Sequence, residues 1–163
     1  MSTRPESLPD DPELRRKIAQ ELGSGKDPHA VGLLASFLRD EDVDVRLAAV
    51  ESLESLGAER RIDGTSELFY HPPQEECAMA LTVALDDENG HIRWRAAKAL
   101  GELASFGSLG SWHSRVVSEL VRLLGDDNKH VAWAAADVLE VIGDSEAREK
   151  VRRFKQLRLK AGG

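Results

Sequence analysis

The chain lacks the features that would place it outside the cell or in a membrane. It has a single cysteine among 163 residues, Cys77, which excludes an internal disulfide framework and fits a reducing compartment. No apolar run approaches the roughly 18 residues that a membrane-spanning helix needs. The N-terminal segment MSTRPESLPDDPE contains no apolar stretch of the kind found in signal peptides. We therefore expect a cytoplasmic protein that does not engage a membrane.

The usual signatures of catalysis and metal binding are also missing. The segment GSGK at 23–26 has neither the spacing nor the Ser/Thr of a phosphate-binding loop, and no G-x-S-x-G nucleophile motif occurs. None of the five histidines is followed by glutamate, so the paired His-Glu motifs of a di-iron site are absent. We therefore expect no catalytic residue, no metal and no cofactor, which favours a protein that is not an enzyme.

The composition is that of a folded domain with an uneven distribution of charge. Hydrophobic residues make up 41% of the chain and charged residues 31%, which argues against global disorder. The net charge of −7 argues against a general nucleic-acid-binding protein. Residues 144–163 nevertheless carry seven basic side chains against three acidic ones, a net +4, which leaves −11 on residues 1–143. The basic tail is either the solvated face of a terminal helix or a docking element for an acidic partner or RNA.

One pattern occurs three times in the chain. The segments LRDEDVDVRLAAVESL (38–53), LDDENGHIRWRAAKAL (85–100) and LGDDNKHVAWAAADVL (124–139) align without gaps, at offsets of 47 and 39 residues. Each holds an aspartate, then an Asp or Asn suited to a helix N-cap, then apolar residues at helical spacing. A second apolar pattern with helical spacing precedes each segment. Each repeat therefore predicts two antiparallel helices joined by about six polar residues.

Further amphipathic patterns flank the three repeats. Leu14, Ile18 and Leu22 predict one helix before them, and Ala147, Val151, Phe154 and Leu157 predict another after them. Terminal elements of this kind cover the ends of a repeat array. We expect residues 1–10 to be flexible and residues 11–160 to form a single domain of about eight helices. Its predicted parts are repeats at about 27–57, 74–104 and 112–143, and a terminal helix at 144–160.

These segments resemble HEAT repeats, in particular the short HEAT-like repeats of the phycobilisome-lyase type. The shared pattern is an aspartate in the inter-helix turn followed by V-R-x-x-A-x-x-A-L-G, here DEDVDVRLAAVESL and DENGHIRWRAAKALG. The resemblance covers about residues 27–143. It implies an all-α, right-handed solenoid of about three helix pairs with a capping helix at each end. The first helix of each pair would lie on the convex side and the second would line the concave side.

The resemblance also implies a structural role for the charged residues of the turns. In such repeats the turn aspartate and the arginine six residues later often form a hydrogen-bonded ladder between neighbours. The residues that match are Asp40, Arg46, Asp87, Arg93 and Asp126. Because Ala132 stands where the third arginine would be, we expect the ladder to lapse in the last repeat.

Large apolar side chains occupy a helical position that the core does not require. With about 100° per residue, the position two residues after Val45, Ile92 and Val131 points about 200° away from them. The residues there are Leu47, Trp94 and Trp133, with Ala97, Lys98, Gly101, Asp137 and Glu140 beside them. Tryptophan is enriched in binding sites, so we interpret this column as a binding surface on the concave face. The alternative is that the tryptophans only cover one another or are covered by the terminal helix.

Two inserts interrupt the repeats. Residues 58–76 include Phe69 and Tyr70, and residues 105–114 include Trp112. A loop as long as the first is uncommon unless it is functional or mobile. Each insert is either a packed surface loop or an extension of the binding surface at its rim.

Three functions are compatible with this pattern. The favoured one is a non-catalytic interaction or scaffold module that binds a protein or peptide with basic residues around an apolar anchor. The resemblance offers a second, a bilin lyase-type subunit that handles a chromophore. A third is a HEAT-like DNA glycosylase, but Glu51, Glu54, Asp137 and Glu140 would repel phosphate. The sequence does not predict an oligomeric state.

Overall fold

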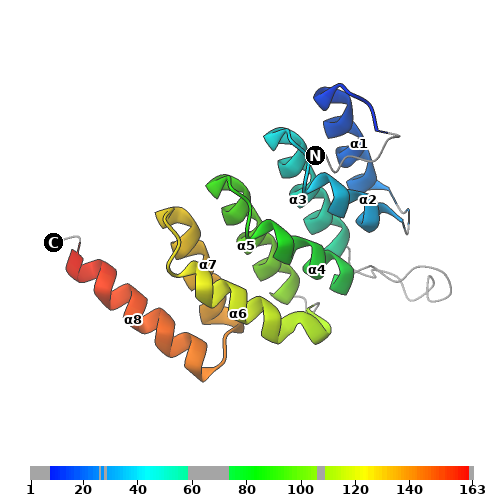
Figure 1. Ribbon diagram of the computed structural model, residues 1–163. Coiled ribbons are helices and arrows are strands. Elements are labelled where there is room, and N and C mark those ends of the chain that lie inside the picture. The colour runs from blue at the N-terminus through cyan, green and yellow to red at the C-terminus, as the bar shows by residue number, and fades with distance from the viewer. Residues whose placement is uncertain (1–7, 26, 28, 59–73, 106–108, 162–163) are drawn as a thin grey trace.

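The computed structural model is an array of helices in two layers (Figure 1). It describes residues 8–25, 27, 29–58, 74–105 and 109–161, and within these ranges it contains eight α-helices and no strand. The helices are α1 (Pro12–Ser24), α2 (Ala30–Phe37), α3 (Val43–Ala58), α4 (Gln74–Ala84), α5 (Gly90–Ser105), α6 (His113–Leu123), α7 (Lys129–Ile142) and α8 (Ser145–Ala161). One 3-10 turn, η1 (Gly110–Trp112), leads into α6. In the described ranges no helix is long and apolar enough to cross a membrane.

The two layers consist of alternate helices. The odd layer holds α1, α3, α5 and α7, and the even layer holds α2, α4, α6 and α8 (Figure 1). Successive odd-numbered helices pack against each other more extensively than successive even-numbered helices do. Tighter packing on one side is what the inner surface of a curved helical array requires. The molecule is thus an all-α solenoid whose odd layer corresponds to the face that we expected to be concave.

The repeated residues start the helices and fill the space between the layers. Asp42, Asn89 and Asn128 each accept a hydrogen bond from the backbone N–H two residues on, as N-caps do. The apolar positions that follow are completely buried in all three repeats: Val45, Ala49, Leu53, Ile92, Ala96, Leu100, Val131, Ala135 and Leu139. Burial of these side chains on the inward stripe of each odd-numbered helix supplies the main force that stacks the repeats.

An arginine ladder joins the acidic turns that precede the odd-numbered helices. The Nε of Arg46 in α3 donates to Asp87 at 2.8 Å, and the Nε of Arg93 in α5 donates to Asp126 at 2.8 Å. A second guanidinium nitrogen of Arg46 donates to the backbone carbonyls of Asp40 and Glu41, in its own turn. Each arginine therefore binds the backbone of its own repeat and the carboxylate of the next one.

The pKa values of the last rung reflect this pairing. The hydrogen bond to Asp126 raises the pKa of Arg93 above its usual value. Burial raises the pKa of Asp126, but hydrogen bonds from Arg93 and from the backbone N–H of Asn128 outweigh it and leave that pKa below its usual value. Both groups therefore stay charged at neutral pH, and the rung is an ion pair.

The ladder differs from the sequence prediction in two respects. The expected lapse at Asp126 is wrong, because the partner of Asp126 is Arg93 of the preceding repeat; Ala132 affects only a rung that would come after α7. The ladder also has an earlier rung, in which Arg15 of α1 donates to both carboxylate oxygens of Asp40. Arg15 is only 1% exposed, and it follows its N-cap Asp11 at the same spacing at which Arg46 follows Asp42.

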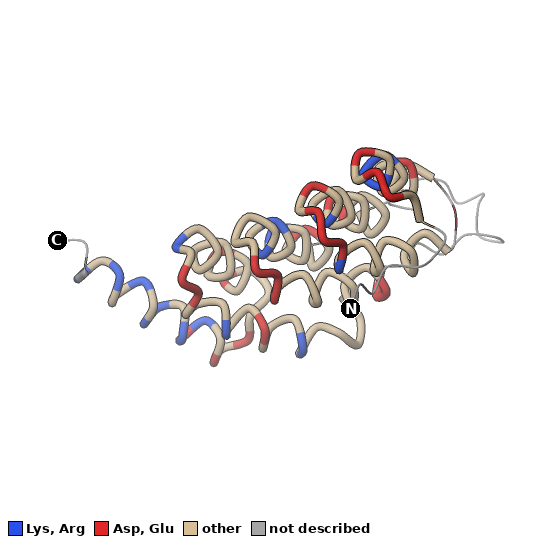
Figure 2. Tube along the Cα trace, turned by 45° about the horizontal axis from the view of Figure 1, so that its top comes forward, with Lys and Arg blue, Asp and Glu red and all other residues tan. Residues whose placement is uncertain are grey.

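Charge follows the same architecture. Acidic residues recur in the turns that lead into the odd-numbered helices, and basic residues are spread along α8 (Figure 2). The ladder arginines hold exposed carboxylates in these turns as well, since Arg46 pairs with Glu88 at 3.2 Å and Arg93 with Asp127 at 2.6 Å. One edge of the array is therefore acidic and its last helix is basic.

Candidate functional site

Leu47, Trp94 and Trp133 stand at one helical position in three successive odd-numbered helices. Leu47 and Trp94 are half-buried and pack against the edge of the core, while Trp133 is 37% exposed. All three therefore present part of a large apolar side chain at the surface of the odd layer. Exposed apolar side chains in register across a repeat array are candidates for contact with a partner.

The two tryptophans differ in what covers them. Trp94 stacks on His91, one turn earlier in α5, with ring centroids 5.4 Å apart and an interplanar angle of 23°. Trp133 meets Phe154 of α8 edge to face at 5.3 Å, and the ammonium of Lys155 lies 5.9 Å from its ring centroid. The terminal helix thus covers part of Trp133. The indole of Trp94 has its ring contact within its own helix, although Trp133 is the more exposed of the two side chains.

The small residues beside the tryptophans serve packing. Ala97 is completely buried, as are Val50 and Ala136 at the same helical position. This position faces the next odd-numbered helix, so Ala97 lies inside the helix–helix contact. We predicted it as part of an open groove, and its burial corrects that prediction.

Gly101 is required by the approach of α5 to α7. A Cβ atom at Gly101 would lie 2.7 Å from one methyl carbon of Val138 and 3.2 Å from the other. Only a residue without a side chain fits there unless Val138 moves. The absence of a side chain also leaves surface space that other residues of the predicted site surround.

Exchange of Gly101 for alanine tests this contact. Because the added methyl group overlaps Val138, we expect Gly101→Ala to lower the free energy of unfolding by about 1–2 kcal/mol. Urea unfolding followed by circular dichroism measures the change. The double variant Gly101→Ala/Val138→Ala should lose less free energy of unfolding than the two single variants lose in sum. A loss in the double variant that exceeds this sum would contradict the steric cause.

A shallow hollow of about 270 Å³ lies between α5 and α7 on this face. It brings together three residues of the predicted site, Lys98, Gly101 and Asp137. The rest of its lining comes from residues that sequence reasoning did not single out: Glu102, Ser105, Val138 and Val141. Val141 is 67% exposed and gives the hollow an apolar edge. Glu140, also predicted, is instead held by Lys155 of α8 at 2.7 Å.

A cluster of charges lies between α3 and α5 on the same face. Arg95 makes two contacts with the carboxylate of Glu54, at 2.5 and 3.0 Å, and lies 3.9 Å from Glu51. Glu54 is only 7% exposed. Burial raises the pKa of Glu54 to about 7, with Glu102 adding to the rise and Arg95 opposing it. Its charge therefore changes near neutral pH.

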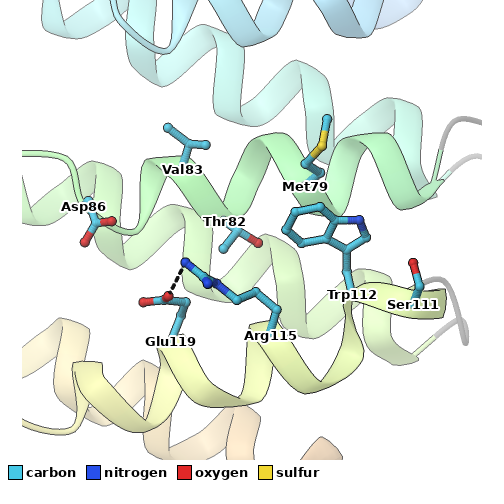
Figure 3. Close-up of a pocket in the computed structure, with 8 residues that line it drawn as sticks. All are labelled: Met79, Thr82, Val83, Asp86, Ser111, Trp112, Arg115 and Glu119. Carbon is cyan, nitrogen blue, oxygen red and sulfur yellow. Dashed lines mark ion pairs between the residues drawn. The ribbon is translucent and has the colours of Figure 1, made fainter.

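The structure describes one of the three predicted rim residues, Trp112. Phe69 and Tyr70 lie outside the described residues. Trp112 belongs to η1 and lines a groove of about 730 Å³ between α4 and α6 (Figure 3). That groove lies in the even layer, so Trp112 does not extend the odd-layer face.

Met79 and Val83 line the same groove and were missed by sequence reasoning. They are 42% and 46% exposed. A signal for them was present, because the helical pattern of α4 assigns Ala78 and Leu81 to the core and leaves Met79 and Val83 outside it. The molecule thus carries one partly apolar surface on each layer.

Chemistry-bearing groups are sparse in the described ranges. They contain no cluster of three or more His, Cys, Asp or Glu side chains that could hold a metal ion. Cys77 is buried in the core, and burial raises the pKa of its thiol to about 12. A thiol that stays protonated at neutral pH is a poor nucleophile, so Cys77 serves packing.

Comparison with known protein families matches residues 7–85 to HEAT repeats. The matched range contains α1 to α4 and the first rung of the ladder, between Arg15 and Asp40. No curated protein matches the chain in sequence. The match supports the general repeat family rather than its phycobilisome-lyase subset.

Proposed function

Because the chain is a HEAT-repeat protein, we propose that it acts as a non-catalytic scaffold that binds a partner protein through the exposed face of its odd layer. HEAT repeats generally serve as protein-interaction scaffolds. Stacked repeats offer an extended surface, since each helix pair presents equivalent positions to the solvent. The single buried cysteine favours a reducing compartment such as the cytoplasm.

The observation that carries the proposal is Trp94. Its helical position is not required by the core stripe, and its ring contact is with His91 of the same helix. Leu47 on α3 occupies the equivalent position one repeat earlier. A half-buried tryptophan with an aliphatic neighbour in the preceding repeat is a suitable anchor for an apolar side chain of a partner.

The charge around this anchor indicates the chemistry of the partner. Glu51, Glu102 and Asp137 are exposed on the same face. Lys98 is exposed there too, and Arg95 is already bound to Glu54. The surface is therefore acidic on balance. It suits a protein or peptide that presents an apolar side chain between basic residues, and it opposes a phosphate backbone.

Trp94→Ala is expected to weaken selective capture of the partner. The experiment compares proteins retained from a lysate of the source organism by the wild type, by Trp94→Ala and by Leu14→Ala, which removes an exposed leucine from α1. The wild type and the Leu14→Ala variant should both retain a partner that binds through Trp94. Trp94→Ala should bind this partner at least ~10-fold more weakly, because it loses an anchor worth about 1.4 kcal/mol or more. Circular dichroism confirms that each variant is folded.

Two results would speak against this function. One is the same set of retained proteins for the wild type and Trp94→Ala. The other is a change in the absorbance of a biliverdin-type pigment on titration with the protein, which would favour the chromophore-handling alternative. Short duplex DNA serves as a further ligand, and salt-dependent binding to it would contradict the electrostatic argument.

A further inference from the structure

The last two turns of α8 form an exposed, basic arm. Leu157 and Leu159 are 68% and 75% exposed, the highest values among the exposed large apolar residues of the described ranges. The earlier apolar residues of α8, Val151 and Phe154, are buried against the array. Arg158 and Lys160 stand next to the two leucines in the chain, while Arg152 and Arg153, earlier in α8, pair with Glu149. The free end of α8 points away from the rest of the molecule (Figure 1).

The groove between α4 and α6 has the complementary shape. It measures about 730 Å³, and Met79 and Val83 of α4 stand above Trp112 and α6 (Figure 3). Its end is fixed, because the hydroxyl of Ser111 donates to Glu75 at 2.7 Å and ties η1 to α4. On the α6 side, Arg115 is paired with Glu119 at 3.0 Å. The groove is thus a partly apolar depression whose η1 end is tied to α4.

The charges around the α4–α6 groove indicate the chemistry of the segment that binds there. Asp86 and Glu119 line the groove and pair with Arg122 and Arg115, and Glu75 and Glu76 at the start of α4 add two further exposed carboxylates near its Trp112 end. The arm carries an excess of positive charge, so two arms would repel each other. An acidic, apolar groove is the surface of this molecule that complements a basic, apolar helix end.

The arm cannot reach the groove of its own chain. Consecutive helices alternate in direction, so α6 and α8 run the same way. The free end of α8 therefore lies on the opposite side of the array from the start of α6, where Trp112 stands (Figure 1). The occupant must come from a second molecule.

We propose that the exposed end of α8 in one copy docks in the α4–α6 groove of a second copy. Leu157 enters the space beside Met79, Val83 and Trp112, and Lys160, one turn further on, faces the acidic rim. Leu159 lies about 200° around the helix from Leu157 and stays outside the groove. When two copies exchange arms reciprocally, each contributes one arm and one groove. The result is a closed two-fold dimer. A contact made in one direction only would instead build an open chain of molecules. This proposal does not depend on the odd-layer face or on its partner.

Sedimentation velocity of the full chain over a range of concentrations tests the proposal. Each contact is small, so we expect a concentration-dependent dimer with a Kd of about 10–100 µM. The arm variant Leu157→Glu/Leu159→Glu and the groove variant Met79→Glu/Val83→Glu should each raise the Kd at least ~10-fold. Val141→Glu is the control for a glutamate added at an exposed apolar residue outside both surfaces, and it should leave the Kd unchanged.

Mixing the two variants gives the sharper test. The groove variant keeps a functional arm and the arm variant keeps a functional groove, so an equimolar mixture retains one contact. The mixture should form more dimer than either variant alone and less than the wild type. Recovery of dimer also shows that both variants are folded.

Three outcomes would overturn the proposal. The wild type could remain a monomer up to ~300 µM, where a Kd in the proposed range predicts mostly dimer. Dimers could form but survive Met79→Glu/Val83→Glu, which would place the arm elsewhere. The arm could instead bind vesicles of anionic phospholipid without any self-association, which would assign Leu157 and Leu159 to a membrane surface.

Discussion

Asp87→Ala is expected to lower the free energy of unfolding by about 3–5 kcal/mol, because it removes the buried carboxylate that pairs with Arg46 and leaves the guanidinium only the exposed Glu88. The side chains of Arg46 and Asp87 are only 8% and 6% exposed. Asp87 also accepts a hydrogen bond from the backbone N–H of Asn89 at 2.8 Å, so the turn before α5 loses a second contact. Urea unfolding followed by circular dichroism at neutral pH measures the loss.

The neighbouring residue supplies the control for the ladder. Asp86 has a side chain that is 70% exposed and pairs with Arg122, so Asp86→Ala should cost less than about 1 kcal/mol. The double variant Arg46→Met/Asp87→Leu removes both charges and should recover much of the loss, since no unpaired charge is left behind. Equal effects of Asp86→Ala and Asp87→Ala would show that the ladder does not hold the repeats together.

Glu54→Gln is expected to change how stability depends on pH. The pKa of Glu54 is raised to about 7 in the folded chain, so the folded state binds a proton that the unfolded chain has already released. The wild type should therefore lose stability as pH rises from about 4.5 to about 7, by about 2–3 kcal/mol. Glutamine has no proton to lose, so the stability of the variant should rise relative to that of the wild type as pH rises across this window.

The informative quantity is the difference between the two proteins at each pH. Groups that titrate in both proteins contribute equally, so their effects cancel in this difference. The contact with Arg95 that the variant loses adds an offset to the difference, and this offset does not vary in the window. Glu51→Gln is the matched control, because Glu51 lies in the same helix. Its carboxylate is half exposed and lies 3.9 Å from Arg95. Stability curves for Glu54→Gln and the wild type that stay parallel between pH 4.5 and 8 would contradict the burial of this charge.

The repeat pattern predicts the register of the helices well. The same positions that align in the sequence become N-caps at Asp42, Asn89 and Asn128 and buried contacts at Val45, Ile92 and Val131. These properties are local, since they depend on spacing along one helix and on the residue type at its start. For this reason a single sequence suffices to place them.

Properties that depend on the neighbouring helix were harder to predict. The resemblance to HEAT repeats implied that Arg46 and Asp87 are ladder residues but did not show that each arginine reaches forward to the next turn, so Ala132 was misread as a gap. The helical angle placed Ala97 beside Trp94 without showing that the next odd-numbered helix covers it. The contact of Phe154 with Trp133 depends on how α8 crosses α7, which no pattern within one helix encodes.

The most direct test of the scaffold function is photo-crosslinking from the odd-layer face in living cells. A photoreactive amino acid replaces Lys98, which is exposed beside Gly101 and Asp137 in the hollow of that face, or Arg39, which is exposed at the end of α2. The account predicts a discrete crosslinked protein from position 98, none from position 39, and loss of the product when Trp94→Ala is added. A product that forms equally from both positions, or that persists with Trp94→Ala, would contradict it.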